Sequence, residues 1–167
     1  MRNILVSAVG GGVGQSVLKA LDDSSYGVVG VDTDELAAGL YAVSKAYQGQ
    51  KASDPHFIDR LLEICRKEDC GLIFPGHEGE LLPLSLHAER FRSEGIIPVV
   101  SSPEVIRICD DKLATQDFLK AQGFPTLETR PLKEVESFHK PVILKPQRGG
   151  ARSQHTYAAH STEDLNK

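Results

Sequence analysis

Two lysines and a glycine-containing loop in the second half of the sequence carry the clearest chemical signal. Lys145 ends the apolar run 142–144 and is followed closely by the loop 147–153, which contains Gly149, Gly150 and Ser153. A strand end fixes the position of an ammonium group, and glycine backbone amides can close over an anion. A single lysine at a strand end is usually a solvated edge charge. The combination predicts a polyphosphate site.

Lys112 supplies a second cation for this predicted site. It lies 33 residues before Lys145 and directly follows Asp111, at the expected start of a helix. Each lysine alone is a weak signal, but their order and separation make the pair informative.

A second candidate site lies near the N-terminus, where Gly10 to Gly14 separate an expected strand from an expected helix. This is the position of a phosphate-binding turn in nucleotide-binding α/β folds, and Asp32 ends the next strand where a ribose hydroxyl would bind. However, Gln15 occupies the sixth position of the dinucleotide fingerprint, which requires a small residue. An NAD(P)-binding module therefore stays an alternative to a tight turn that needs positive φ and little side-chain volume.

Polar side chains also follow the expected strand 72–75. His77, Glu78 and Glu80 lie at the carboxyl edge of the predicted sheet, where open α/β folds bind ligands. Together with Gly11 and Gly12, the two glutamates are candidate substrate-binding residues. The alternative is a solvated polar loop in which Glu78 or Glu80 caps the next helix.

The cysteines and histidines indicate no metal or nucleophile site. Cys65, Cys70 and Cys109 form no CxxC pair and have no histidine at ligand spacing, so free thiols are expected. The six histidines form no HExxH motif and accompany no nucleophile elbow, which disfavours metalloproteases and triad hydrolases.

The elements that must position these residues alternate along the first two thirds of the chain. Short aliphatic runs predict strands, and apolar residues at helical spacing predict helices between them. This alternation predicts a Rossmann-like, three-layer α/β domain with a mainly parallel sheet. The expected strands are 3–9, 26–31, 45–48, 72–75 and 96–100, and the main expected helices are 15–21, 57–65 and 81–93.

The remaining chain has a different pattern. A helix is expected over 110–122, followed by extended segments at 126–129, 142–145 and 156–159, and a helix start with a capping box at 161–164. We therefore expect two domains, 1–107 and an incomplete α+β domain over 108–167.

Composition excludes several classes of partner. The chain has 167 residues, 40% hydrophobic and 6% aromatic, with no Trp and a net charge of −4. Such a chain can build an aliphatic core, but it lacks the basic excess expected of a nucleic-acid-binding protein. No apolar stretch approaches the roughly 20 residues of a membrane span. We expect a cytoplasmic protein that acts on small molecules; a homodimeric scaffold without a ligand is a third alternative.

The order of these motifs resembles the ATP-grasp superfamily, in particular the carbamoyl-phosphate synthase large subunit and its single-module relatives. The resemblance rests on the glycine-turn domain, the Asp111-Lys112 pair heading a helix that ends at 121–126, the segment 141–146, and the glycine loop. It implies a pre-ATP-grasp domain followed by the opening part of an ATP-grasp domain.

The resemblance also implies an activity. In such proteins the equivalents of Lys112 and Lys145 contact ATP, and the loop with Gly149, Gly150 and Ser153 covers its phosphates. A carboxylate or carbamate is phosphorylated, and an amine-type nucleophile then attacks the acyl phosphate. Mg²⁺ is required, and its ligands are expected beyond residue 167. We therefore expect a truncated ligase that binds nucleotide weakly and does not turn over.

Overall fold

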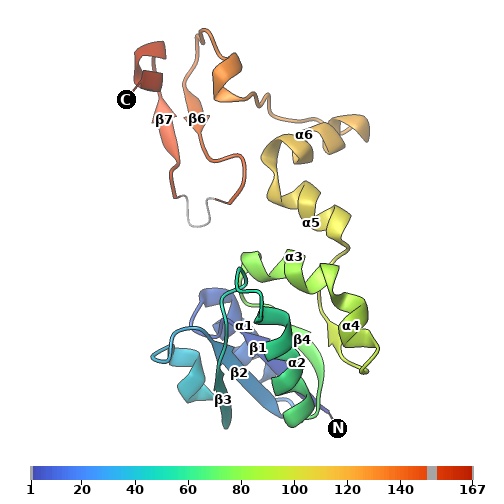
Figure 1. The fold of residues 1–167 in the computed structure, drawn as a ribbon. Helices are drawn as coiled ribbons and strands as arrows, with labels where there is room; N and C mark the ends of the chain where they lie inside the picture. The colour runs from blue at the N-terminus through green and yellow to red at the C-terminus, as the bar shows by residue number, and fades with distance from the viewer. Residues whose placement is uncertain (1, 150–153, 167) are drawn as a thin grey trace. The chain divides into compact units, whose positions relative to one another are not determined.

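The computed structural model describes residues 2–149 and 154–166. The chain divides into two compact units, Met1–Pro103 and Glu104–Lys167, which are considered separately (Figure 1).

The first unit contains a five-stranded sheet with the order β3-β2-β1-β4-β5. Every neighbouring pair is parallel, which confirms the predicted sheet. The last strand is shorter than the apolar run 96–100 suggested, since only Ile97 and Pro98 pair with β4 and Pro98 has no N–H to donate. The strands are β1 Asn3–Ser7, β2 Val28–Asp32, β3 Lys45–Gln48, β4 Cys70–Phe74 and β5 Ile97–Pro98.

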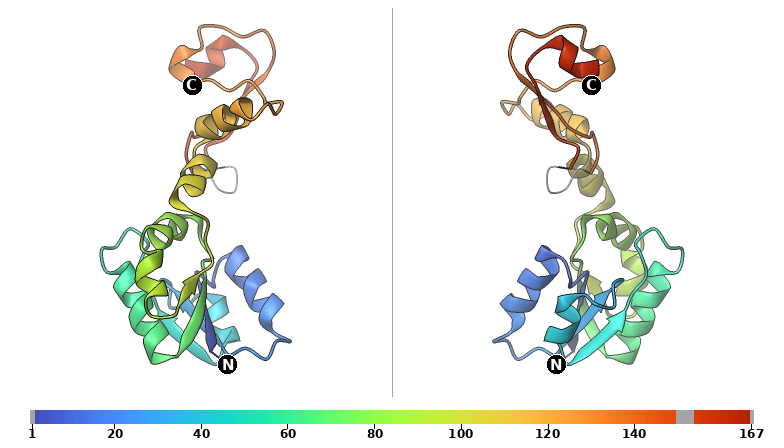
Figure 2. Two further views of the ribbon diagram at one scale, coloured as in Figure 1. Left: turned by 90° about the vertical axis from the view of Figure 1, so that its right-hand side faces the viewer. Right: turned by 90° about the vertical axis from the view of Figure 1, so that its left-hand side faces the viewer.

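Helices cover both faces of this sheet (Figure 2). Successive side chains of a strand point to opposite faces. Leu5 therefore packs with buried residues of α2 and α4, whereas Ile4 and Val6 contact the apolar side of α1. This arrangement gives the predicted three layers. The helices of the unit are α1 Gly12–Leu21, η1 Ala38–Ala42, α2 Phe57–Lys67, α3 Glu78–Leu86 and α4 Ala88–Arg92.

The helix expected over 81–93 differs from the prediction in two ways. It begins earlier, at Glu78, because the side chain of His77 caps it, and histidine is not among the usual capping residues. It is also divided into α3 and α4 at His87, whose backbone φ and ψ of −106° and 13° depart from helical values.

The second unit combines helices with a short hairpin. β6 and β7 pair antiparallel with Leu144 opposite Tyr157, so the expected strands at 142–145 and 156–159 are confirmed. The segment 126–129 joins neither sheet among the described residues, and the expected helix start at 161–164 forms a 3₁₀ helix. The elements are α5 Pro103–Asp110, α6 Lys112–Ala121, η2 Leu132–Glu134, β6 Val142–Leu144, β7 Tyr157–Ala159 and η4 Thr162–Asn166.

Candidate functional site

The strand order creates a ligand-binding position in the first unit. From β1 the chain builds the sheet outward through β2 and β3, and it then returns to place β4 on the other side of β1. Open parallel sheets bind ligands at the carboxyl ends of the strands where the order reverses. Here that position lies between the glycine turn after β1 and the segment 76–80 after β4, so the structure brings these two predicted groups to one edge.

The glycine turn is shaped by close packing. A Cβ on Gly14 would lie 2.4 Å from the Ala8 carbonyl oxygen and 2.8 Å from Val9 Cα, so α1 approaches the end of β1 through this residue. The expected positive φ within 10–14 is absent, and Ala8 adopts it instead, with φ 48°. Gly12 has open space around it. The prediction that the turn needs little side-chain volume is thus confirmed at Gly14, whereas the prediction that it needs positive φ was wrong.

Asp32 is occupied by backbone contacts. One carboxylate oxygen accepts the Gly10 N–H at 2.7 Å, and the other accepts the Asp34 N–H at 3.0 Å. The side chain therefore ties the glycine turn to the end of β2. These bonds give Asp32 a structural role, and each carboxylate oxygen keeps a second acceptor site.

Glu80 is buried and anchors the segment 76–80, on the other side of the ligand-binding position from the glycine turn. Its side chain is almost fully enclosed, and Oε2 accepts hydrogen bonds from Ser7 Oγ at 2.6 Å, Gly76 N at 3.2 Å and His77 N at 3.3 Å. The His77 side chain also caps the start of α3, since its Nδ1 accepts the Gly79 N–H at 3.0 Å. These contacts support the helix-capping alternative for Glu80, while Glu78 lies exposed in the first turn of α3.

Burial raises the pKa of the Glu80 carboxyl, and the hydrogen bonds from Ser7, His77 and Gly76 oppose the rise in part. The folded protein therefore binds this proton more tightly than the unfolded chain. The resulting stabilisation is fully present below the unfolded pKa and is lost as pH rises through the folded pKa. Glu80→Gln retains an acceptor for Ser7 but does not titrate.

We therefore expect the free energy of unfolding of the wild type, relative to Glu80→Gln, to fall as the pH rises above 4.5, the ordinary pKa of a glutamate side chain. Urea unfolding of both proteins at a series of pH values measures this difference. A difference that stays flat or increases with pH would contradict the assignment.

The second unit brings Lys112 against the loop that follows β6. Its backbone N–H donates to the Gln147 carbonyl at 3.0 Å, and its Nζ donates to the Gly149 carbonyl at 2.9 Å. Gly149 has φ 63°, a left-handed conformation that glycine adopts without strain. Lys145 is exposed just after β6. Gly150 and Ser153 lie outside the described residues.

Sequence reasoning missed what Asp111 does with its carboxylate. One oxygen caps α6 by accepting from Leu113 N and Ala114 N, as a residue at this position is expected to do. The other accepts from Gln147 Nε2 at 2.7 Å and Arg148 Nε at 3.1 Å. The Ala114 and other hydrogen bonds hold the pKa of Asp111 below its usual range, against the effect of burial. No sequence pattern indicates this contact across 36 residues.

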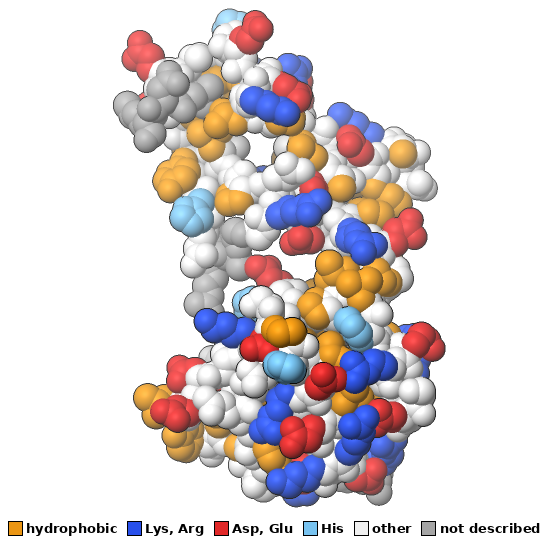
Figure 3. Space-filling model, viewed as in Figure 1, with side chains coloured by type: hydrophobic (Ala, Val, Ile, Leu, Met, Phe, Trp, Pro, Cys, Tyr) orange, Lys and Arg blue, Asp and Glu red, His pale blue; other side chains and the backbone are white. Residues whose placement is uncertain are grey.

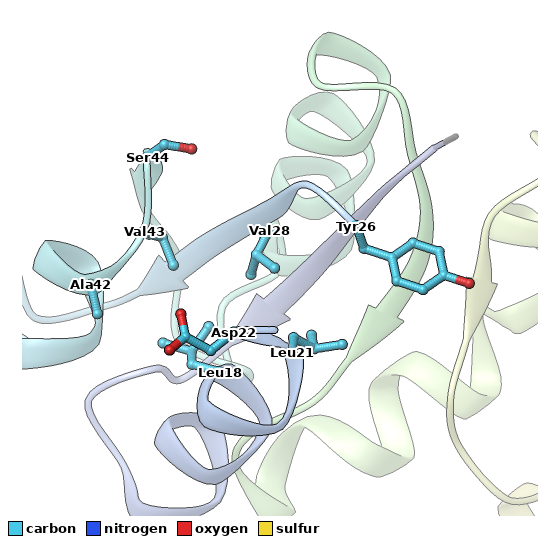
Figure 4. Close-up of a pocket in the computed structure, with 8 residues that line it drawn as sticks. All are labelled: Leu18, Leu21, Asp22, Tyr26, Val28, Ala42, Val43 and Ser44. Atoms are coloured by element: carbon cyan, nitrogen blue, oxygen red, sulfur yellow. The ribbon is translucent and has the colours of Figure 1, made fainter. Parts of the chain in front are cut away.

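No metal site is found in the described parts of the chain. Residues 2–149 and 154–166 contain no group of His, Cys, Asp and Glu suited to a metal ion, and all three cysteines are free thiols, as expected. A pocket of about 140 Å³ lies between the end of α1 and the start of β2 (Figure 4). It is at the opposite edge of the sheet from the glycine turn and is small compared with typical ligand sites.

The surface shows mixed charge. On the face of the first unit visible in Figure 3, Lys and Arg side chains alternate with Asp and Glu. Separately, the ion pairs Arg66–Glu94 and Arg90–Asp59 join α2 to the region of α4. This face therefore offers no single-sign patch to a polyanion. Among the helices of the described residues, none is both long enough and apolar enough to cross a membrane.

The parallel sheet with helices on both faces, and the glycine turn that follows its first strand, define a Rossmann-like α/β domain. Residues 4–100 match the family of PylC-like N-terminal domains, and the chain belongs to this family.

Relatives extend the comparison over both units. The chain is 27% identical to biotin carboxylase 2 of Bacillus subtilis (strain 168) over 131 residues, covering 71% of this chain and 29% of that protein. The ADP complex of N5-carboxyaminoimidazole synthetase from Staphylococcus aureus superposes with a TM-score of 0.74 and 21% identity, covering 99% of this chain and 43% of that one.

A third similarity is to the biotin carboxylase domain dimer of Hydrogenobacter thermophilus 2-oxoglutarate carboxylase, in complex with MgADP, ADP and bicarbonate. The TM-score is 0.68 at 19% identity, over 99% of this chain and 39% of that one. At these identities the two structures establish a shared fold. The chain spans less than half the length of each of these three proteins.

Proposed function

We propose that this chain forms the N-terminal part of an ATP-dependent ligase of the ATP-grasp type. Residues 1–107 would be the pre-ATP-grasp domain, and residues 108–167 the opening part of the ATP-grasp domain. The observation that carries the proposal is the contact of Lys112 with the loop 147–149, because it joins a cation and glycine backbone at one place. Membership of the family supports the same conclusion.

We propose that the residues named here bind a triphosphate. Lys112 and Lys145 would neutralise its charge, and the loop with Gly149, Gly150 and Ser153 would cover the β- and γ-phosphates. Phosphoryl transfer depends mainly on such positioning and charge neutralisation. Mg²⁺, when bound, would supply further neutralisation of the phosphate charge. The described residues offer no carboxylate cluster for it, so its ligands would come from outside them.

The reaction would activate a carboxylate, bicarbonate or carbamate as an acyl phosphate that an amine then attacks. The names of the biotin carboxylase and carboxyaminoimidazole synthetase relatives favour carboxylation of a nitrogen nucleophile. A reaction like that of the carbamoyl-phosphate synthase large subunit stays a second possibility within this class. Glu78, Gly11 and Gly12, at the switch position of the first unit, are the candidates for contact with the acceptor.

We further propose a cytoplasmic protein that is able to form a homodimer. The related biotin carboxylase domain is a dimer, which supports the second part of this proposal. Size-exclusion chromatography with light scattering tests it directly.

Calorimetry with MgATP tests the nucleotide site. We expect weak binding by the wild-type chain and at least a tenfold loss in Lys145→Ala, because a phosphate contact of a fixed ammonium is a charge-assisted hydrogen bond. Lys112→Ala should lose affinity similarly. Lys140→Ala is the matched control, since this exposed lysine lies before β6 rather than after it.

Equal MgATP affinity in the wild type and Lys145→Ala would argue directly against the proposal. A thermal shift caused by NAD(P) but not by MgATP would instead support the dinucleotide alternative at Gly10 to Gly14 and Asp32.

A further inference from the structure

We infer that Arg148 is an additional cation of the phosphate site, and that Asp111 is the positioning residue that holds it there. The inference rests on the proposed function, since it names further residues of the same site. It draws on three observations in the second unit: the geometry of Asp111, the exposure of Arg148, and the charge of the segment 141–149.

Asp111 joins two parts of the chain that must act together. Its side chain is only 7% exposed, and its two oxygens serve different partners. Oδ1 binds the first N–H groups of α6, and Oδ2 binds Gln147 and Arg148. Asp111 and Arg148 also form an isolated antiparallel bridge. The carboxylate thus fixes the loop relative to the helix start that carries Lys112.

Arg148 is held in a way that leaves most of its guanidinium available. Only Nε donates to Asp111, and the side chain is 71% exposed. Its Nη groups, which carry four of the five donors of an arginine, make no hydrogen bond to the described residues. A guanidinium presented in this way matches the geometry of phosphate oxygens.

The charge around the loop is also typical of an anion site. The segment 141–149 contains Lys145 and Arg148 and no acidic residue, and Lys112 donates into the same loop. Asp111 is the acid that contacts the segment, and it compensates one of the three cations. The uncompensated positive charge is the complement of a polyphosphate.

Asp111→Asn separates the two roles of the carboxylate. Asparagine caps helices as well as aspartate, so α6 should be retained. The replacement puts an NH₂ group where Oδ2 stood. The Gln147 amide can turn over and accept from it, but Arg148 carries only donors and loses its partner.

We expect Asp111→Asn and Arg148→Ala each to weaken MgATP binding about tenfold by calorimetry. The double variant should lose little more MgATP affinity than either single variant, because each substitution already removes the coupled Asp111–Arg148 pair. Arg148→Lys should retain part of the affinity, since it keeps the charge. Arg130→Ala, which alters another exposed arginine of this unit, is the matched control and should bind as the wild type.

A readout without nucleotide tests the positioning role separately. The Lys112 amide donates to Gln147 O, next to Arg148, so its hydrogen exchange should become about tenfold faster in Asp111→Asn if the Arg148 contact, rather than the retained Gln147 contact, holds the loop. Thermal unfolding should change little. A loss of MgATP affinity that follows a loss of thermal stability would replace the positioning role with a merely structural one.

The two proposals fail in different ways. If Lys145→Ala weakens binding but Arg148→Ala does not, the phosphate role of Arg148 is overturned and the proposed function stands. If Lys145→Ala and Lys112→Ala also leave binding unchanged, the proposed function fails and the phosphate role of Arg148 fails with it. Unchanged exchange of the Lys112 amide in Asp111→Asn overturns the positioning role in either case.

Discussion

Gly14→Ala is expected to destabilise the first unit by about 3 kcal/mol, at the upper end of the usual cost of overpacking. The added methyl group would lie 2.4 Å from the Ala8 carbonyl oxygen and 2.8 Å from Val9 Cα. Both are backbone atoms next to β1, the central strand, so no flexible side chain can move aside. Relief requires α1 to lift from the sheet, which would expose the apolar contacts of Val17, Leu18 and Leu21.

Gly12→Ala is the matched control for this substitution, two residues away in the same helix. A Cβ at Gly12 meets no atom within 4 Å, and its φ is not positive. Alanine has the higher helix propensity, so this variant should be as stable as the wild type or slightly more stable. Urea unfolding followed by circular dichroism measures both. Equal stability of the two variants would show that α1 does not pack as described.

Glu80→Ala is expected to cost about 2–4 kcal/mol of unfolding free energy, since it leaves the Ser7 hydroxyl and two backbone N–H groups without their acceptor. Ser7 is buried at the end of β1, and Gly76 is buried two residues after the end of β4. Water does not readily replace the lost carboxylate at such sites. The loss should therefore loosen the edge of the sheet at which the glycine turn and the segment 76–80 meet.

Glu78→Ala provides the comparison within the same helical turn. Glu78 is exposed and contributes only through the positive end of the α3 dipole, so its loss should cost about 0.3–1 kcal/mol. Chemical denaturation of both variants under one set of conditions shows which of the two glutamates contributes more to the free energy of unfolding. A cost for Glu78→Ala that matches or exceeds that of Glu80→Ala would mean that the buried carboxylate does not anchor this edge.

The strands of the first unit were predictable because they are buried on both faces and therefore appear as short aliphatic runs. The runs that contain Leu5, Val29 and Ile73 each form a strand of the parallel sheet. Helix boundaries were less predictable. α3 begins at Glu78 because an imidazole ring nitrogen of His77 accepts a backbone N–H, a role that depends on side-chain orientation rather than on residue type.

The candidate site was also predictable only in part. The order of Lys112, Lys145 and the glycine loop predicts that they belong to one site. The structure shows the contact of Lys112 Nζ with the Gly149 carbonyl, and the shared site stays a prediction. The two glutamates of the segment 76–80 could not be distinguished in advance. They differ by two positions on one helix, yet one faces the buried end of β1 and the other faces solvent.

The sequence by itself determined the α/β class, the parallel sheet and the place of the glycine turn, because these follow from local periodicity and backbone preferences. Only the tertiary structure decided which polar side chains form hydrogen bonds that stabilise the fold. Asp32, Glu80 and Asp111 each accept hydrogen bonds from residues at least 22 positions away in the chain. Such contacts depend on how elements pack together, and no short stretch of sequence encodes that packing.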